Sequence, residues 1–179
     1  MKKYLYMIAA LFGIDYFCKE NIEAQKPEDF PRDMEKSHGK IRLYRNHNDG
    51  FCFGVKKEKK ELVRMVPVVF TSAAAGILTW LLCRDEGRKA DRIGFALITA
   101  GGLSNLYDRL KRGYVVDYFS IRCKYLEKVV FNLGDFFIFA GSALIAAFDL
   151  LGVVRDLSSP AKDHIKALRL PWRKTDEAE

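Results

Sequence analysis

The stretch 65–83 constrains the fold most strongly, because it reads MVPVVFTSAAAGILTWLLC and has no charged side chain between Arg64 and Arg84. A helix rises about 1.5 Å per residue, so this stretch is about as long as the hydrocarbon core of a bilayer is thick. Other apolar blocks are likewise bounded by charged segments. The sequence therefore predicts an all-α membrane protein with four transmembrane helices, at about 4–18, 65–83, 93–108 and 129–154.

Two other interpretations of the apolar blocks stay open. The first block begins MKK and continues with a short apolar run, as a cleaved secretory signal does, but no small-x-small cleavage site follows it. The other blocks could form the buried core of a soluble helical protein. Their separation by basic segments favours the membrane interpretation.

The net charge of +7 suggests nucleic-acid binding, but the distribution of the charge disfavours it. Basic residues in 19–62 are interleaved with acidic ones and show no aromatic platform or known binding fingerprint. The four cysteines have no C-x-x-C spacing and the three histidines are scattered. Neither a metal site nor a disulfide framework is predicted.

The predicted crossings place both termini on one side of the membrane and the loops 19–62 and 109–128 on the other. The polar end of the third span and the start of the fourth lie on the side of these loops. The positive-inside rule does not decide the orientation, because 109–128 is as basic as the opposite side. We divide the chain into a membrane domain, 1–154, and a basic tail, 155–179, which forms either a surface-bound amphipathic helix or a solvated segment.

A polar cluster, GGLSNLYDR, ends the third block at 101–109. On a helix, Gly102, Asn105 and Arg109 share one face, and Asp108 lies beside Asn105. Such groups are costly at a membrane boundary unless they are hydrogen-bonded, which makes them candidate site residues. Asp108 and Arg109 are equally typical of a cluster that anchors a helix end.

Two aspartates form the candidate catalytic pair. Asp117 lies in the β-prone stretch GYVVDY, and Asp135 lies about one turn inside the fourth block, on the helical face of Asn132. A carboxylate inside an apolar span is expensive and therefore indicates function. Asp149 is about 21 Å further along the same helix, at the opposite interface.

Two carboxylates at one low-dielectric site cannot easily both ionise, so one of them holds a proton. In peptide hydrolysis the ionised member accepts a proton from the attacking water. The protonated member polarises the carbonyl oxygen and later protonates the leaving amine. The spacing alone also fits a structural or ion-conducting carboxylate pair.

At these residues the sequence resembles the signal peptidase II family, the lipoprotein signal peptidases. The family pattern Asn-x-x-Asp-Arg, Gly-x-Val-Val-Asp-Phe and Phe-Asn-x-Ala-Asp corresponds to NLYDR at 105–109, GYVVDY at 113–118 and FNLGD at 131–135. The resemblance implies that Asp117 and Asp135 are the catalytic aspartates. It implies substrate-binding or site-shaping roles for Asn105, Asp108, Arg109 and Asn132.

Weaker matches extend the resemblance toward the N-terminus. NDGFCFG is similar to a family loop that faces the substrate, which implies such a role for Asn48 and Gly50. DYFCK is similar to the end of the family's first span, and its Asp15 and Lys19 form an i, i+4 pair. Gly134 replaces a family alanine, and the segment 20–39 is unusually polar. These departures concern substrate choice more than chemistry.

The resemblance implies a membrane aspartyl endopeptidase that removes signal peptides from diacylglyceryl-modified prolipoproteins, cutting just before the lipidated cysteine. It implies a small extracytoplasmic β-cradle between spans 1 and 2, for which the alternating segment 40–46 could supply a strand. The implied location is the bacterial cytoplasmic membrane, with the site near its outer face. The expected partners are the prolipoprotein and membrane lipid, with no cofactor, metal or nucleic acid.

Two rival functions come from other classes. A catalytically altered relative could act as a membrane binding or scaffold protein, which the presence of both Asp117 and Asp135 disfavours. A small transporter could use Asp135 and Asp149 as proton-linked sites. The chain has no duplicated half and no pair of broken helices, which disfavours the transporter.

Overall fold

The computed structural model describes residues 1–50, 60–84 and 87–158. It divides the chain into two compact units, Met1–Ile145 and Ala146–Glu179, and everything below concerns the first unit unless stated otherwise. In chain order the elements are α1 (Lys2–Glu23), the short helix η1 (Pro27–Asp29), β1 (Arg32–Asp33), β2 (Ile41–Asn48), α2 (Lys60–Cys83), α3 (Lys89–Lys111), β3 (Val115–Ile121) and α4 (Leu133–Ser158).

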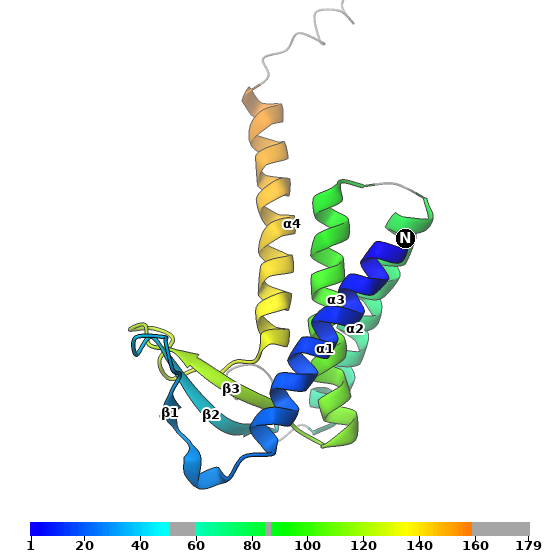
Figure 1. Cartoon of the computed structure of the whole chain (residues 1–179). Helices are drawn as coiled ribbons and strands as arrows, with labels where there is room; N and C mark the ends of the chain where they lie inside the picture. Colours follow the sequence, from blue (N-terminus) through cyan, green and yellow to red (C-terminus); the bar gives the residue numbers. More distant parts are fainter. Residues whose placement is uncertain (51–59, 85–86, 159–179) are drawn as a thin grey trace, which may run out of the picture. The chain divides into compact units, whose positions relative to one another are not determined.

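Helix α3 is the central packing element of the first unit, with α1 and α2 lying against it (Figure 1). Its side toward the neighbouring helices consists largely of small residues, and Ala96 and Ala100 are fully buried. A Cβ atom added to Gly101 would lie only 2.1 Å from the carbonyl oxygen of Gly134 at the start of α4. Small residues allow such close approach of helix backbones.

Large apolar side chains are exposed on the helices. Phe70 is 72%, Phe17 71% and Phe136 57% exposed. Within the described residues, the segments Met65–Cys83 and Leu133–Arg155 are long and apolar enough to cross a membrane. Exposed side chains of this kind are unfavourable in water and stable against lipid. The structure thus confirms the two more apolar of the predicted spans as long apolar helices.

The turn after α3 directs the chain into β3. The backbone N–H of Arg112 donates to the carbonyl oxygen of Asp108 at 2.7 Å, which closes the last turn of the helix. Gly113 then has φ +85°, a left-handed conformation that side chains other than glycine rarely adopt. The chain reverses within these few residues, and β3 begins at Val115 beside the end of α3.

The strands form an antiparallel sheet in the order β1-β2-β3 (Figure 1). The predicted strand at 40–46 overlaps β2 from Ile41 to Asn46. Strands β1 and β2 lie between α1 and α2 in sequence, whereas β3 joins them from the segment between α3 and α4. The sheet therefore ties two distant loops together, with Asn46 opposite Asp117 and Asn48 opposite Val115.

Candidate active site

Asp117 lies on β3 and is only 2% exposed. Its two carboxylate oxygens accept hydrogen bonds from different amide side chains. Asn48 Nδ2 donates to Oδ2 at 3.0 Å, and Asn132 Nδ2 donates to Oδ1 at 2.8 Å. Because β2 and β3 are paired, the strand register brings Asn48 close enough to make this contact. The carboxylate is thus fixed from two sides.

Asp135 lies in the first turn of α4, and its local position follows from the sequence FNLGD. Asn132 immediately precedes the helix, and its Oδ1 accepts from the backbone N–H of Asp135 at 2.9 Å. Asp135 Oδ2 in turn accepts from the backbone N–H of Asn132 at 3.3 Å. This reciprocal pair has the form of a capping box, which satisfies two N–H groups at the helix start. Asp135 Oδ1 also accepts from Asn105 Nδ2 at 2.8 Å.

The two aspartates line one small cavity together with Asn48. Asn132, which is fully buried, contacts both of them: its amide donates to Asp117 while its backbone and side chain cap the turn that holds Asp135. Burial, and after it the nearby charge of Asp135, raises the pKa of Asp117 to about 7. The hydrogen bonds from Asn132 and Asn48 oppose this rise. A shared proton between two carboxylates is the state that this environment favours.

The other predicted site residues fall into two groups. Arg109 lies next to the site, and its Nη2 donates to the carbonyl oxygen of Gly50 at 2.7 Å. The backbone N–H of Gly50 donates to Asn48 Oδ1 at 3.0 Å, so Gly50 is held through both its N–H and its carbonyl group. Asp108, by contrast, does not line either cavity that holds Asp135. It is fully buried and belongs to a separate set of charged contacts.

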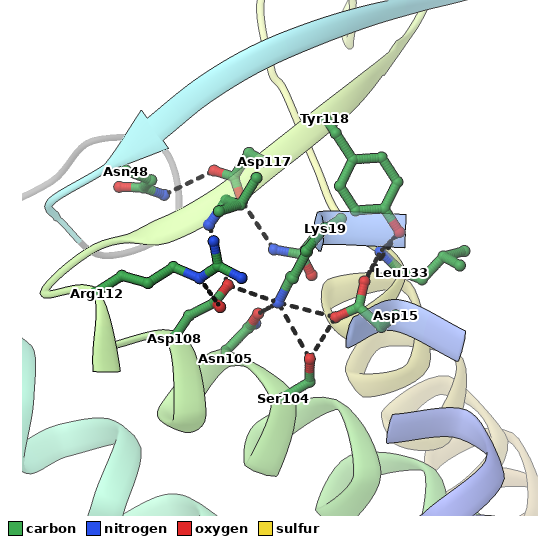
Figure 2. A network of polar contacts seen from close by, with 12 residues as sticks. Asp15, Lys19, Asn48, Ser104, Asn105, Asp108, Arg112, Asp117, Tyr118 and Leu133 are labelled. Atoms are coloured by element: carbon green, nitrogen blue, oxygen red, sulfur yellow. Dashed lines mark hydrogen bonds and ion pairs between the residues drawn. The ribbon is translucent and has the colours of Figure 1, made fainter. Parts of the chain in front are cut away.

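That set is centred on Lys19, and the sequence indicated only its Asp15–Lys19 pair (Figure 2). The ammonium of Lys19 pairs with Asp15 Oδ2 at 2.8 Å and with Asp108 Oδ2 at 3.1 Å. Ser104 Oγ donates to Asp15 Oδ2 at 2.6 Å, and Tyr118 Oη donates to Asp15 Oδ1 at 2.9 Å. The sequence signal was the Asp15–Lys19 spacing. Its partners on α3 and β3 could not be identified without knowing how α1 packs.

A groove of about 630 Å³ opens beside the site and is lined by α2, α3 and α4. Most of its lining is apolar. Its polar members include Asn105, Arg109 and Asp135, of which the first two lie in the C-terminal half of α3. An extended apolar segment lying in this groove would bring its backbone to Asp135.

The hydrogen bond from Asn48 to Asp117 affects the pKa of Asp117, and a substitution of Asn48 tests this effect. Removing this N–H donor in Asn48→Ala should raise the pKa of Asp117, because the hydrogen bond holds that pKa down. If hydrolysis needs the shared proton, the rate falls as pH rises through the pKa of Asp117. The alkaline limb of the pH–rate profile should therefore move to higher pH in Asn48→Ala. Asn46→Ala, an exposed position on the same strand, is the matched control and should leave the limb in place. A shift to lower pH would contradict the contact's role.

The fold and site have the features of an aspartic peptidase embedded in a membrane: two buried carboxylates, amide donors that fix them, and an apolar groove between long helices. The family model described as Signal peptidase (SPase) II matches residues 7–151. The chain therefore belongs to the signal peptidase II family. This confirms the predicted family and the predicted enzyme class, an aspartic signal peptidase.

Individual relatives agree with this assignment. The chain is 30% identical to the lipoprotein signal peptidase of Mesorhizobium japonicum, over 87% of this chain and 90% of that one. It is 34% identical to the lipoprotein signal peptidase of Brucella ovis, over 65% of this chain and 71% of that one. Among solved structures, a bacterial membrane enzyme determined by the in meso method superposes with a TM-score of 0.70. That match is 19% identical in sequence and covers 90% of this chain and 93% of the other. The shared fold and the apolar helices support a membrane location.

Proposed function

We propose that the protein removes signal peptides from diacylglyceryl-modified prolipoproteins, cutting just before the lipidated cysteine, with Asp117 and Asp135 as the catalytic pair. One observation carries the proposal: two carboxylates on different elements line one buried cavity, each held by amide donors, at the edge of an apolar groove. A structural carboxylate pair would not need an adjacent groove. The lipobox specificity comes from the family resemblance.

The chemistry follows from the shared proton. The ionised carboxylate accepts a proton from water as the water oxygen attacks the scissile carbonyl carbon. The protonated carboxylate donates a hydrogen bond to the carbonyl oxygen and afterwards transfers a proton to the departing amine. The amide contacts of Asn48, Asn105 and Asn132 hold both carboxylates without supplying a full charge that would keep both ionised.

The groove fits the two parts of such a substrate. Its apolar walls, which include Phe70, Ile77 and Ile98, suit the apolar core of a signal peptide and the acyl chains of the lipid. Arg109 at its polar end holds the Gly50 carbonyl. We therefore assign Asn48, Gly50, Asn105, Arg109 and Asn132 to binding or shaping the site.

We propose four membrane spans with the site at the extracytoplasmic face of a bacterial cytoplasmic membrane. The pairing of β2 with β3 supports the crossing count, because the loops after α1 and after α3 must lie on the same side to form one sheet. The sheet then serves as the extracytoplasmic cradle. In this arrangement 1–154 forms the peptidase domain and 155–179 a cytoplasmic tail, most of which lies outside the described residues.

Thiol labelling of single-cysteine variants tests this orientation. Cys123 follows β3 and Cys83 ends α2, and both are exposed. A membrane-impermeant maleimide applied to intact cells should label Cys123 and spare Cys83 until the membrane is permeabilised. Cys52, which lies between β2 and α2 in the sequence, is outside the described residues and should behave like Cys123. Labelling of Cys83 from outside, with both loop cysteines protected, would invert the orientation.

The substrate class is tested with the purified protein and a matched pair of prolipoproteins, one diacylglyceryl-modified and one unmodified. We expect a mobility shift on gels for the lipidated substrate and little or none for the unmodified one. Equal cleavage of both substrates would show that the protein does not recognise the lipid. No cleavage of either would favour the rival interpretation, a catalytically altered relative that binds without cutting.

A further inference from the structure

Lys19 is a charged side chain with no access to solvent, near the end of α1. Its ammonium is within 3.1 Å of oxygens from four side chains: those of Asp15, Ser104, Asn105 and Asp108. Burying an ammonium is strongly unfavourable unless it is paired and hydrogen-bonded, and a well-packed apolar side chain is often at least as stable in such a place. Packing alone therefore does not account for a lysine here.

The contact with Asn105 leads directly to the catalytic pair. Lys19 Nζ donates to Asn105 Oδ1 at 2.9 Å, and Asn105 Nδ2 donates to Asp135 Oδ1 at 2.8 Å. An ammonium has only donors, so the oxygen end of the amide must face Lys19. Because the amide is planar, its NH₂ end then faces Asp135. Without the ammonium, the amide could rotate and present its oxygen to Asp135 instead.

A second path runs from the same ammonium toward Asp117. Asp108 Oδ2, which pairs with Lys19, also accepts from the backbone N–H of Val116 at 3.2 Å. Val116 directly precedes Asp117 on β3. The other oxygen of Asp108 accepts from Arg112 Nε at 3.0 Å, so Asp108 keeps a cationic partner even without Lys19. Figure 2 shows Lys19 between these groups, with Asn105 and Asp108 on α3.

We propose that Lys19 is a positioning residue for peptide hydrolysis: its ammonium fixes the Asn105 amide in the orientation that donates to Asp135. This inference rests on the proposed function. Lys19 makes no hydrogen bond to either aspartate of the pair, and its hydrogen-bonded contact with Asp135 runs through Asn105. Its positive charge also lowers the pKa of Asp117. Removing it should lower kcat and leave KM nearly unchanged, because the groove that binds the substrate does not include Lys19.

A charge-balanced variant separates this role from folding. Lys19→Met alone leaves the buried Asp15 carboxylate without its cation. The substitution is therefore combined with Asp15→Asn, so that the double variant loses one positive and one negative charge. The new amide oxygen could still accept from Tyr118 Oη and from the Leu133 N–H, as Asp15 Oδ1 does. Relative to Asp15→Asn, the double variant should show a kcat about tenfold lower. Its KM should stay within about twofold, and Lys19→Arg, which keeps the charge, should restore part of the rate.

A double-mutant cycle with Asn105→Ala gives the decisive comparison, with rates measured in single turnover. If Lys19 acts mainly by orienting Asn105, its replacement should lower the rate much less once Asn105 is gone. An equal loss of rate in both backgrounds would overturn the proposal, as would an unchanged kcat in the charge-balanced variant. Failure of that variant to fold would make Lys19 a purely structural residue. In this experiment an inactive wild-type protein would count against the proposed function itself, so the two failures are distinguishable.

Discussion

Asp117→Asn and Asp135→Asn are each expected to abolish cleavage of a lipidated prolipoprotein, with rates at least about a thousandfold below the wild type. Asparagine matches the shape of aspartate but neither accepts a proton from water nor donates one to an amine. Each substitution keeps the shape of the side chain and one of its two acceptor oxygens. At position 117 that oxygen can accept from Asn132 or from Asn48, and at position 135 it can accept from Asn105 or from the Asn132 N–H. Both variants should therefore fold and enter the membrane.

Asp149→Asn is the matched control on the same helix. Asp149 belongs to the second compact unit and is not among the proposed site residues, so this variant should keep most of the activity. The measurement is the initial rate of prolipoprotein cleavage, with the folded yield of each variant determined by size-exclusion chromatography. Near-normal cleavage by Asp117→Asn or by Asp135→Asn would contradict the assignment of these two aspartates as the catalytic pair.

Gly101→Ala should have the second largest effect, on stability first and activity second. The new Cβ would lie 2.1 Å from the carbonyl oxygen of Gly134 and 3.0 Å from Ile138 Cγ1, so α4 would have to move away from α3. Overpacking of this kind costs about 3 kcal/mol. Gly134 directly precedes Asp135, so the displacement reaches the catalytic pair as well.

Gly76→Ala in α2 is the control, because a Cβ there meets no atom within 4 Å. Alanine favours the helical conformation by about 1 kcal/mol over glycine, so this variant should be as stable as the wild type or slightly more so. Thermal unfolding in detergent, followed with the cleavage rate, makes the comparison. Equal melting temperatures for the two alanine variants would contradict the close packing of α3 and α4.

The candidate catalytic pair could be predicted because a carboxylate in an apolar stretch stands out in any sequence. The family motifs also indicated Asn48, Asn105 and Asn132 as site residues, and the structure places all three in contact with Asp117 or Asp135. Their individual contacts were not predictable. Asn132 is the clearest case. It caps the start of α4, and it also donates a hydrogen bond to Asp117 because β3 places Asp117 beside it.

Helix boundaries are harder to predict, for identifiable physical reasons. The sequence places the first span at about 4–18, but α1 continues to Glu23. Lys19 marks the end of the apolar block in the sequence, whereas in the structure it is buried and neutralised by Asp15 and Asp108. The predicted third span is 93–108, and α3 also includes the charged turns at either end.

The sheet shows what a single sequence could not specify. The alternation in 40–46 indicated a strand, and the β-prone stretch around Asp117 indicated another. Nothing local showed that these two strands pair, because the pairing is between segments about seventy residues apart. The polar segment 20–39 similarly gave no sign that it holds the end of α1, η1 and β1.

The most direct test of the central claim is the intact mass of the peptide that the purified protein releases from a lipidated prolipoprotein. We expect a signal peptide that ends at the residue just before the lipidated cysteine, together with a mature lipoprotein that keeps its lipid. The same incubation with Asp117→Asn should release nothing. A product cut elsewhere, or the same product from Asp117→Asn, would contradict the assignment of the site.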